Sequence, residues 1–80
     1  LFHCDASQAI GKIQISMQSW QVDLLTFSSH LAYGPRGASV LFVRSGTRLK
    51  QIFWGGWQER GLRPGTLNVP SIVGMGAAMQ

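Results

Sequence analysis

Two short apolar segments with a glycine-containing break between them restrict the fold of this chain more than any other feature. Asp23 to Ser28 is a compact apolar run between polar residues, which suits a buried strand better than a helix of useful length. Tyr33 to Gly37 breaks the pattern, and the β-branched and aromatic residues of Val40 to Val43 predict a second strand. A turn at Ser45 to Thr47 closes that strand, so the two strands can pair as neighbours in one sheet.

The N-terminal residues predict shorter elements. Leu1 to Cys4 is a brief extended run, and the polar residues Asp5 to Gln8 predict a turn. After a second turn at Gly11 and Lys12, apolar side chains alternate at Ile13 and Ile15, which is typical of extended structure.

The C-terminal residues predict a helix. Asn68 is placed to cap a helix that begins near Pro70, and we expect this helix to be still under way at Gln80. Its expected apolar face comprises Ile72, Val73 and Ala77.

The length of the chain indicates a piece of something larger. Eighty residues bury on folding only about 60% of the surface that the unfolded chain exposes. Charged residues make up 12% of the chain, which is fewer than in a typical soluble domain. There is no internal repeat and no low-complexity linker. We therefore expect residues 1–80 to form a single partial domain whose two ends are cuts within a longer protein.

Charge and cysteine content narrow the classes of partner. The net charge is +4, but the lysines and arginines are scattered through turns and loops, so no nucleic-acid partner is expected. No apolar run approaches the roughly 20 residues that span a bilayer, so no membrane partner is expected. Cys4 is the single cysteine, so no disulfide can form within the chain, and this fits a reducing compartment. Paired cysteines at the spacing of a metal site are absent. The apolar surroundings of Cys4 favour a buried structural thiol.

The segment from Gly55 to Thr66 carries four glycines and Pro64, so its backbone needs unusual dihedral angles or a close approach to another group. Loops of about 12 residues without secondary structure of their own are usually functional or disordered. The arginines, glutamate and glutamine within this loop favour ordered contacts.

Three sequence blocks carry the chemical signal by their order. They are His3 to Gln8, reading HCDASQ, Ser28 to Gly37, reading SSHLAYGPRG, and Gly55 to Thr66, reading GGWQERGLRPGT. Each residue taken alone has an ordinary structural explanation. Together the blocks closely resemble the cysteine desulfurases, class V members of the aminotransferase fold type I enzymes, which read HxDAxQ, SxHKxYGPxG and GGGQERGxRxGT. The resemblance covers almost the whole chain, and its third block is the most specific.

The resemblance implies a site for pyridoxal 5′-phosphate, a cofactor that needs a protonated ring nitrogen and an anchored phosphate. Asp5 resembles the carboxylate partner of the pyridinium nitrogen, because a nearby negative charge favours the charged ring. Gln8 resembles the residue that binds the ring hydroxyl oxygen. The phosphate cradle is expected at Ser28, Ser29 and His30.

Thr66 resembles a phosphate ligand that the other subunit contributes, which implies a homodimer with shared sites. The family's earlier phosphate-binding threonine, its ring-stacking histidine and its loop with the sulfur-accepting cysteine have no counterpart in this chain. Cys4 is not that cysteine.

Leu31 is the main departure from the family pattern, since the family has at this position the lysine that forms a Schiff base with the cofactor. Leucine has no nucleophile and cannot exchange a substrate proton. We therefore expect no intact catalytic residue in this chain, and a cofactor that binds weakly or without a covalent bond. A smaller departure is Trp57, in place of a third glycine, which would crowd the loop. Trp54 and Trp57 favour packing into a dimer interface over an exposed binding pair.

The fold expected from the resemblance is α/β, a portion of the large domain of pyridoxal-phosphate-dependent transferases. That domain has a mixed, mostly parallel sheet with one antiparallel strand, here assigned to Val40 to Val43, and flanking helices. The expected function is that of a cysteine desulfurase fragment. The family transfers sulfur from L-cysteine, leaves alanine and serves iron–sulfur cluster assembly.

The resemblance also implies a sulfur-acceptor protein as partner and a location in the cytoplasm or mitochondrial matrix. Two alternatives stay open. One is a non-catalytic homologue that keeps the fold for a structural or regulatory role, and the other is a related class V enzyme such as a selenocysteine lyase.

Overall fold

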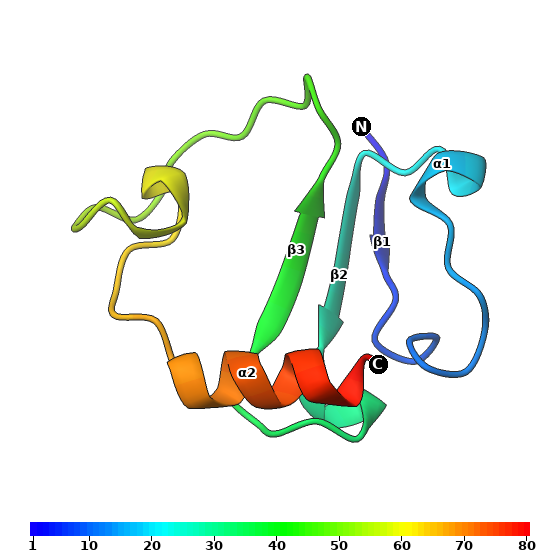
Figure 1. Ribbon diagram of the computed structural model, residues 1–80. Helices are drawn as coiled ribbons and strands as arrows, with labels where there is room; N and C mark the ends of the chain where they lie inside the picture. Colours follow the sequence, from blue (N-terminus) through cyan, green and yellow to red (C-terminus); the bar gives the residue numbers. More distant parts are fainter.

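A computed structural model describes residues 1–80, and its centre is a three-stranded sheet with helices beside it (Figure 1). The strands are β1 (His3–Asp5), β2 (Leu24–Ser28) and β3 (Ser39–Val43), and they lie in the order β1-β2-β3. β1 pairs with β2 in parallel, whereas β2 pairs with β3 in the antiparallel direction. The predicted α/β class and mixed sheet are confirmed, and β3 is the antiparallel strand that was assigned to Val40 to Val43. Asp5, predicted to open a turn, is the last residue of β1.

The register of the strands assigns each side chain to one of two faces of the sheet. Asp5 lies opposite Thr26, and Ser28 lies opposite Ser39. Because side chains alternate along a strand, one face carries these polar residues and the other faces the core. At the centre of the core are the fully or almost fully buried Ala6, Val22 and Leu25. The half-buried side chains packed against them are Cys4, Ala9, Ile15, Met17, Trp20, Phe27 and Phe42.

The connection between β1 and β2 differs from its predicted structure. No strand forms at Ile13 and Ile15, because turns already use the nearby amide groups, with Lys12 N and Ile13 N donating to Ala9 O at 2.9 and 3.1 Å. A short helix, α1 (Met17–Trp20), follows instead. Ser16 caps this helix through its side-chain oxygen, which accepts from Ser19 N at 3.2 Å. The four residues of α1 are too few to show a helical period in the sequence.

The C-terminal helix α2 (Val69–Ala78) begins as predicted. Asn68 is its cap, and Asn68 Oδ1 accepts a hydrogen bond from Ser71 N at 3.3 Å. The helix ends at Ala78, so the predicted continuation through Gln80 is wrong. In its last turn Met79 N still donates to Met75 O, and Gln80 lies outside the helix.

The face of α2 that approaches the rest of the chain is the predicted one only at Ile72, which lines an open groove between α2, β3 and the loop after β3. Val73 is 65% exposed, and Ile72 and Ala77 are also exposed. The helix instead brings Gly74 against Pro35, where an added Cβ would lie 2.8 Å from Pro35 Cγ. A small residue permits this approach of the helix backbone, which a pattern of bulky apolar residues does not reveal.

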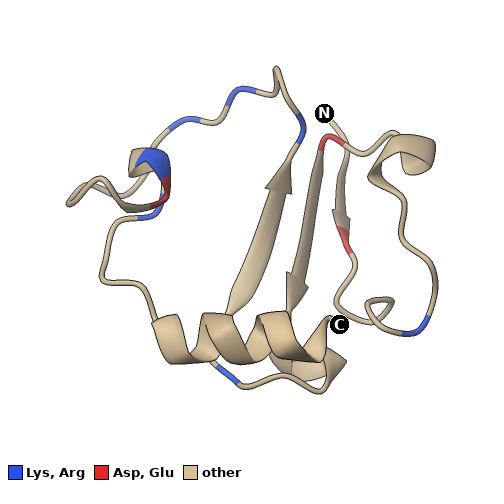
Figure 2. Ribbon diagram, viewed as in Figure 1, with Lys and Arg blue, Asp and Glu red and all other residues tan.

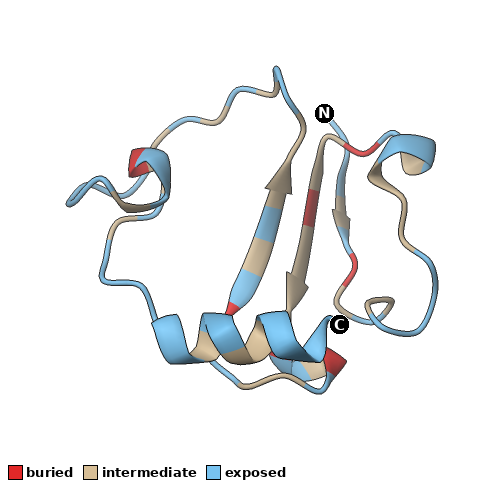
Figure 3. Cartoon of the chain, viewed as in Figure 1, coloured by how far each residue is buried: buried red, intermediate tan, exposed pale blue.

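Much of the apolar surface is open, and only 7 of the 80 residues are buried. Exposed apolar residues are most numerous on the long loop after β3 and on α2. Both segments are mostly exposed in Figure 3. Lysine and arginine are spread over loops and turns, and α2 carries none of them (Figure 2). None of the helices combines the length and apolar character that crossing a membrane requires.

Candidate cofactor-binding site

The carboxyl ends of β1 and β2 meet at one edge of the sheet, because these two strands run in parallel. Asp5 is the last residue of β1 and Ser28 the last of β2, and Asp5 is in register with Thr26, two residues before Ser28. Ligands of open α/β sheets bind beyond the carboxyl ends of the strands. The structure therefore brings two of the predicted site residues to the edge where such a ligand binds.

The carboxylate of Asp5 is exposed and held from one side. Its Oδ1 atom accepts a hydrogen bond from Ser7 N at 2.9 Å, and the Ser7 side chain also donates to the carboxylate. Hydrogen bonds from the side chain and backbone of Ser7 lower the pKa of Asp5. Desolvation opposes this and raises the pKa, and the nearby His3, the weakest of the four effects, lowers it. Asp5 is thus an exposed anion at the end of β1. Gln8 is exposed in the turn that follows.

The chain leaves β2 through a 3₁₀ turn, η1 (Ser29–Ala32), which carries the second sequence block. Ser28 Oγ lies 3.4 Å from Ser39 Oγ on the neighbouring strand. His30 is exposed, and Leu31 is half-buried. Tyr33, in the left-handed region with φ of 62°, ends the turn, and Gly34 N donates to Ser29 O at 3.0 Å. Ser28 thus ends β2, and His30 follows it two residues later in η1.

Ser29 is the one member of the predicted cradle that faces inward. Its side chain is fully buried, and Ser29 Oγ has no hydrogen-bond partner. Its backbone amide is also in use, since Ser29 N donates to Ala38 O at 3.0 Å. Gly34 packs directly on the Ser29 hydroxyl, where a Cβ would overlap it. In this structure the Ser29 hydroxyl is therefore out of reach of a ligand at this edge.

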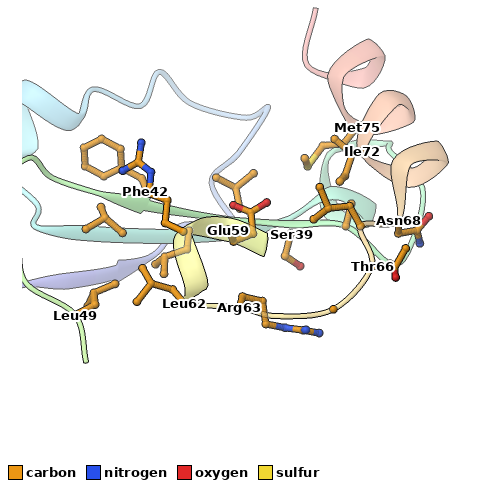
Figure 4. A pocket seen from close by; sticks show the side chains of 18 of the residues that line it. Ser39, Phe42, Leu49, Glu59, Leu62, Arg63, Thr66, Asn68, Ile72 and Met75 are labelled. Carbon is orange, nitrogen blue, oxygen red and sulfur yellow. The ribbon is translucent and has the colours of Figure 1, made fainter. Parts of the chain in front are cut away.

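Thr66 lies apart from these residues, on the rim of an open groove of about 960 Å³ (Figure 4). The groove lies between β3, the loop after it and α2. Ser39 and Thr66 line it, whereas Asp5, Ser28 and His30 do not. Within one chain the structure does not bring Thr66 together with the residues at the ends of β1 and β2.

Sequence reasoning missed a pair beside Asp5. His3 Nε2 lies 3.0 Å from Thr26 Oγ1, on the same face of the sheet as Asp5. The signal was the alternation along β1, which puts His3 and Asp5 on one face. The position of Thr26 opposite Asp5 depends on the register, which the residue pattern does not show.

Cys4 is half-buried and packs against the core, in keeping with a structural thiol.

Trp54 and Trp57 are exposed, and the ring of Trp57 lies against Gly61. The predicted crowding of the loop by Trp57 is avoided because Gly61 has no side chain.

The sequence profile of one protein family, aminotransferase class-V, matches residues 1–80, and the chain belongs to that family. Its curated relatives include cysteine desulfurases. That of Enterobacter agglomerans is 51% identical over 80 residues, covering 100% of this chain and 20% of the relative. The mitosomal cysteine desulfurase of Trachipleistophora hominis is 51% identical, covering 98% of this chain and 18% of the relative. The chain thus spans about a fifth of the length of these relatives.

Solved structures agree with this assignment. A NifS-like protein superposes with a TM-score of 0.90 at 48% identity, covering 96% of this chain and 21% of that protein. The NifS-like protein from Rickettsia africae gives a TM-score of 0.92 at 36% identity, covering 98% and 22%. SspA in complex with cysteine gives a TM-score of 0.90 at 42% identity, covering 98% and 23%. The predicted family and fold are confirmed.

Proposed function

We propose that the full-length protein carrying this chain binds pyridoxal 5′-phosphate as cysteine desulfurases do, and that this partial domain, residues 1–80, holds the ring and the phosphate. The observation that carries the proposal is the parallel pairing of β1 with β2, which brings Asp5 and Ser28 to the same edge of the sheet. The similarity to cysteine desulfurases over the whole chain supports it.

The residues at this edge fit the cofactor. Asp5 is held as an exposed anion, which suits an ion-paired hydrogen bond from a protonated pyridine nitrogen. Gln8 follows in the next turn and would bind the ring hydroxyl oxygen. The Ser28 hydroxyl and the His30 imidazole would donate to the phosphate, and Thr66 of a second subunit would complete the phosphate site. The bound cofactor would supply an electron sink for the bonds at the substrate α-carbon.

Leu31 removes the covalent attachment and the proton carrier. Its half-buried aliphatic side chain can neither bind the cofactor aldehyde nor take up and return a proton. We therefore propose that the cofactor binds without a covalent bond in this protein, and that ordinary turnover is abolished.

The proposed substrate class is L-cysteine. The resemblance to cysteine desulfurases and to SspA in complex with cysteine supports this assignment. The sulfur would pass to a cysteine that this chain does not contain, since Cys4 is packed against the core in β1. That cysteine would lie in the full-length protein outside residues 1–80. The sulfur acceptor would be a separate protein.

A second candidate function follows from Leu31 itself. A homologue that keeps the fold and the cofactor-binding residues but has lost the lysine would serve a structural or regulatory role. A selenocysteine lyase, the other alternative, would share the residues described here and differ in its substrate loop.

The test uses the full-length protein with three residues at position 31, namely the present leucine, Leu31→Lys and Leu31→Met as a control without an amine. Each variant is mixed with pyridoxal phosphate, desalted, and assayed for retained visible absorbance and for sulfide and alanine release from L-cysteine. Sulfide and alanine released with lysine alone support a desulfurase scaffold. Cofactor absorbance without sulfide release in Leu31→Lys supports the non-catalytic homologue. Selenide released from L-selenocysteine in preference to sulfide supports the lyase. Absence of cofactor binding in all three proteins would refute the proposal.

A further inference from the structure

The loop that precedes Thr66 is closed by a side-chain hydrogen bond. Gln58 Oε1 accepts from Gly65 N at 3.2 Å, across seven residues of sequence. Gly56 makes room for this contact, because a Cβ at position 56 would overlap Gln58 Oε1. Two glycines of the third sequence block thus serve one interaction, the closure of the loop by the Gln58 amide.

A second contact within the same loop joins Trp57 to Gly61. The Trp57 side chain is 85% exposed, yet its ring covers Gly61, which is buried within a mostly exposed loop. A Cβ at Gly61 would lie 3.1 Å from Trp57 Cε3. Between these residues Glu59 and Arg60 have positive φ angles of 49° and 58°, in the turn η2 (Gln58–Gly61). Such angles are unfavourable for residues with a side chain, so the contacts on either side must hold the turn in place.

Thr66 follows Gly65 directly and precedes a second anchored point. Asn68 caps α2 by accepting from Ser71 N, and its amide also packs on Gly37, where a Cβ would lie 2.9 Å from Asn68 Nδ2. Thr66 therefore lies between the closed loop on one side and the fixed start of α2 on the other.

We propose that Gln58 and Trp57 form a clasp that positions the Thr66 hydroxyl for the phosphate group of the cofactor. The inference rests on the proposed function, in which Thr66 is a phosphate ligand, and it adds two positioning residues that touch neither the ring nor the reacting atoms. A clasp of this kind controls where Thr66 lies without contributing to the ring-binding edge at β1 and β2. Its loss should therefore affect recognition of the phosphate alone.

The test compares two ligands in the full-length protein, pyridoxal 5′-phosphate and pyridoxal, which lacks the phosphate. Equilibrium dissociation constants are measured by dialysis or fluorescence for the parent, for Gln58→Leu, which has no acceptor, and for Gln58→Glu, which keeps one. The matched control is Gln51→Leu, because Gln51 Nε2 donates to Phe53 O at 2.9 Å in the same long connection and makes no hydrogen bond to residues 55–66.

We expect Gln58→Leu to weaken pyridoxal-phosphate binding about two- to tenfold, the range for one net hydrogen bond, and to leave pyridoxal binding unchanged. Gln58→Glu should retain most of the parent's affinity for pyridoxal phosphate, and Gln51→Leu should match the parent. Trp57→Ala should weaken pyridoxal-phosphate binding as Gln58→Leu does. Equal losses for both ligands, or no loss, would overturn the clasp. A parent that binds neither ligand would instead refute the proposed function, and the clasp with it.

Discussion

His3 Nε2 and Thr26 Oγ1 lie 3.0 Å apart across β1 and β2, on the face of the sheet that carries Asp5. β1 is only three residues long, so few backbone hydrogen bonds hold it in place. Thr26 is the register partner of Asp5, and His3 lies two residues before Asp5. The contact therefore ties the short strand to its neighbour at the position of the proposed ring-binding carboxylate.

Replacing Thr26 by valine should weaken this tie without changing the volume of the side chain greatly. We expect the free energy of unfolding to fall by about 0.5–1 kcal/mol, the net value of a partly exposed hydrogen bond. Denaturant unfolding measures the change. Thr26→Ser keeps a hydroxyl and should lose less, so an equal loss in both variants would show that the methyl contacts matter and the hydrogen bond does not.

The lowered pKa of Asp5 predicts a specific dependence of stability on pH. Ser7 donates to the folded carboxylate, so the folded pKa lies below the ordinary value of 3.8. The stabilisation is present above the unfolded pKa and is lost as the pH falls through the folded pKa. Asp5→Asn should therefore show a smaller loss of stability than the parent on acidification below about pH 4. Ser7→Ala, which keeps the backbone donor, should fall between them, and identical acid profiles for all three would contradict the assigned cause.

Side-chain patterns predicted the strands better than the short helix α1. The apolar run ending at Ser28 and the β-branched run ending at Val43 became β2 and β3, because strand character depends on local composition. The Asn68 cap was also found, since capping requires a particular side chain next to a helix. The short helix after Ser16 was missed, because its stability comes from one cap and the packing of Trp20.

The candidate site was predictable in composition but not in arrangement. The block around Asp5 identified a carboxylate, and the structure shows why it remains ionised. The inward direction of Ser29 and the contact of His3 with Thr26 depend on the backbone of η1 and on the strand register. Neither can be obtained from residue spacing, because one residue of shift along a strand reverses the face to which each side chain points.

The buried hydroxyl of Ser29 predicts that a smaller apolar residue is tolerated there. Ser29 Oγ is buried without a partner, a situation that costs about 1–3 kcal/mol for a polar group. Ser29→Ala should therefore leave the free energy of unfolding unchanged or raise it by about 1 kcal/mol. A clear loss of stability would indicate a hydrogen bond that this geometry does not contain.

Gly34 supplies an independent check on the same contact. An added Cβ would overlap Ser29 Oγ and lie 3.1 Å from Ser29 O, so Gly34→Ala should destabilise the protein by more than about 1 kcal/mol. In the Ser29→Ala background the overlap with Oγ disappears, and the loss should shrink. A double-mutant cycle measures this coupling, and purely additive effects would show that the two side chains do not meet.

Arg44 connects the end of β3 to the segment before β2. Its Nε donates to Val22 O and its second guanidinium nitrogen, Nη2, to Met17 O, each at 2.7 Å, and the side chain is half-buried. Arg44→Met keeps the aliphatic stem but leaves both carbonyl groups without their charged donor, so we expect a loss of about 1–3 kcal/mol in the free energy of unfolding. Arg44→Lys should recover only part of that loss, because one ammonium group cannot reproduce the fork that reaches two carbonyls.

Arg48 is exposed and makes no side-chain hydrogen bond, so Arg48→Met should stay within about 0.5 kcal/mol of the parent. If Arg44→Met matched Arg48→Met in denaturant unfolding, the two short contacts would contribute nothing to holding β3 against the rest of the chain.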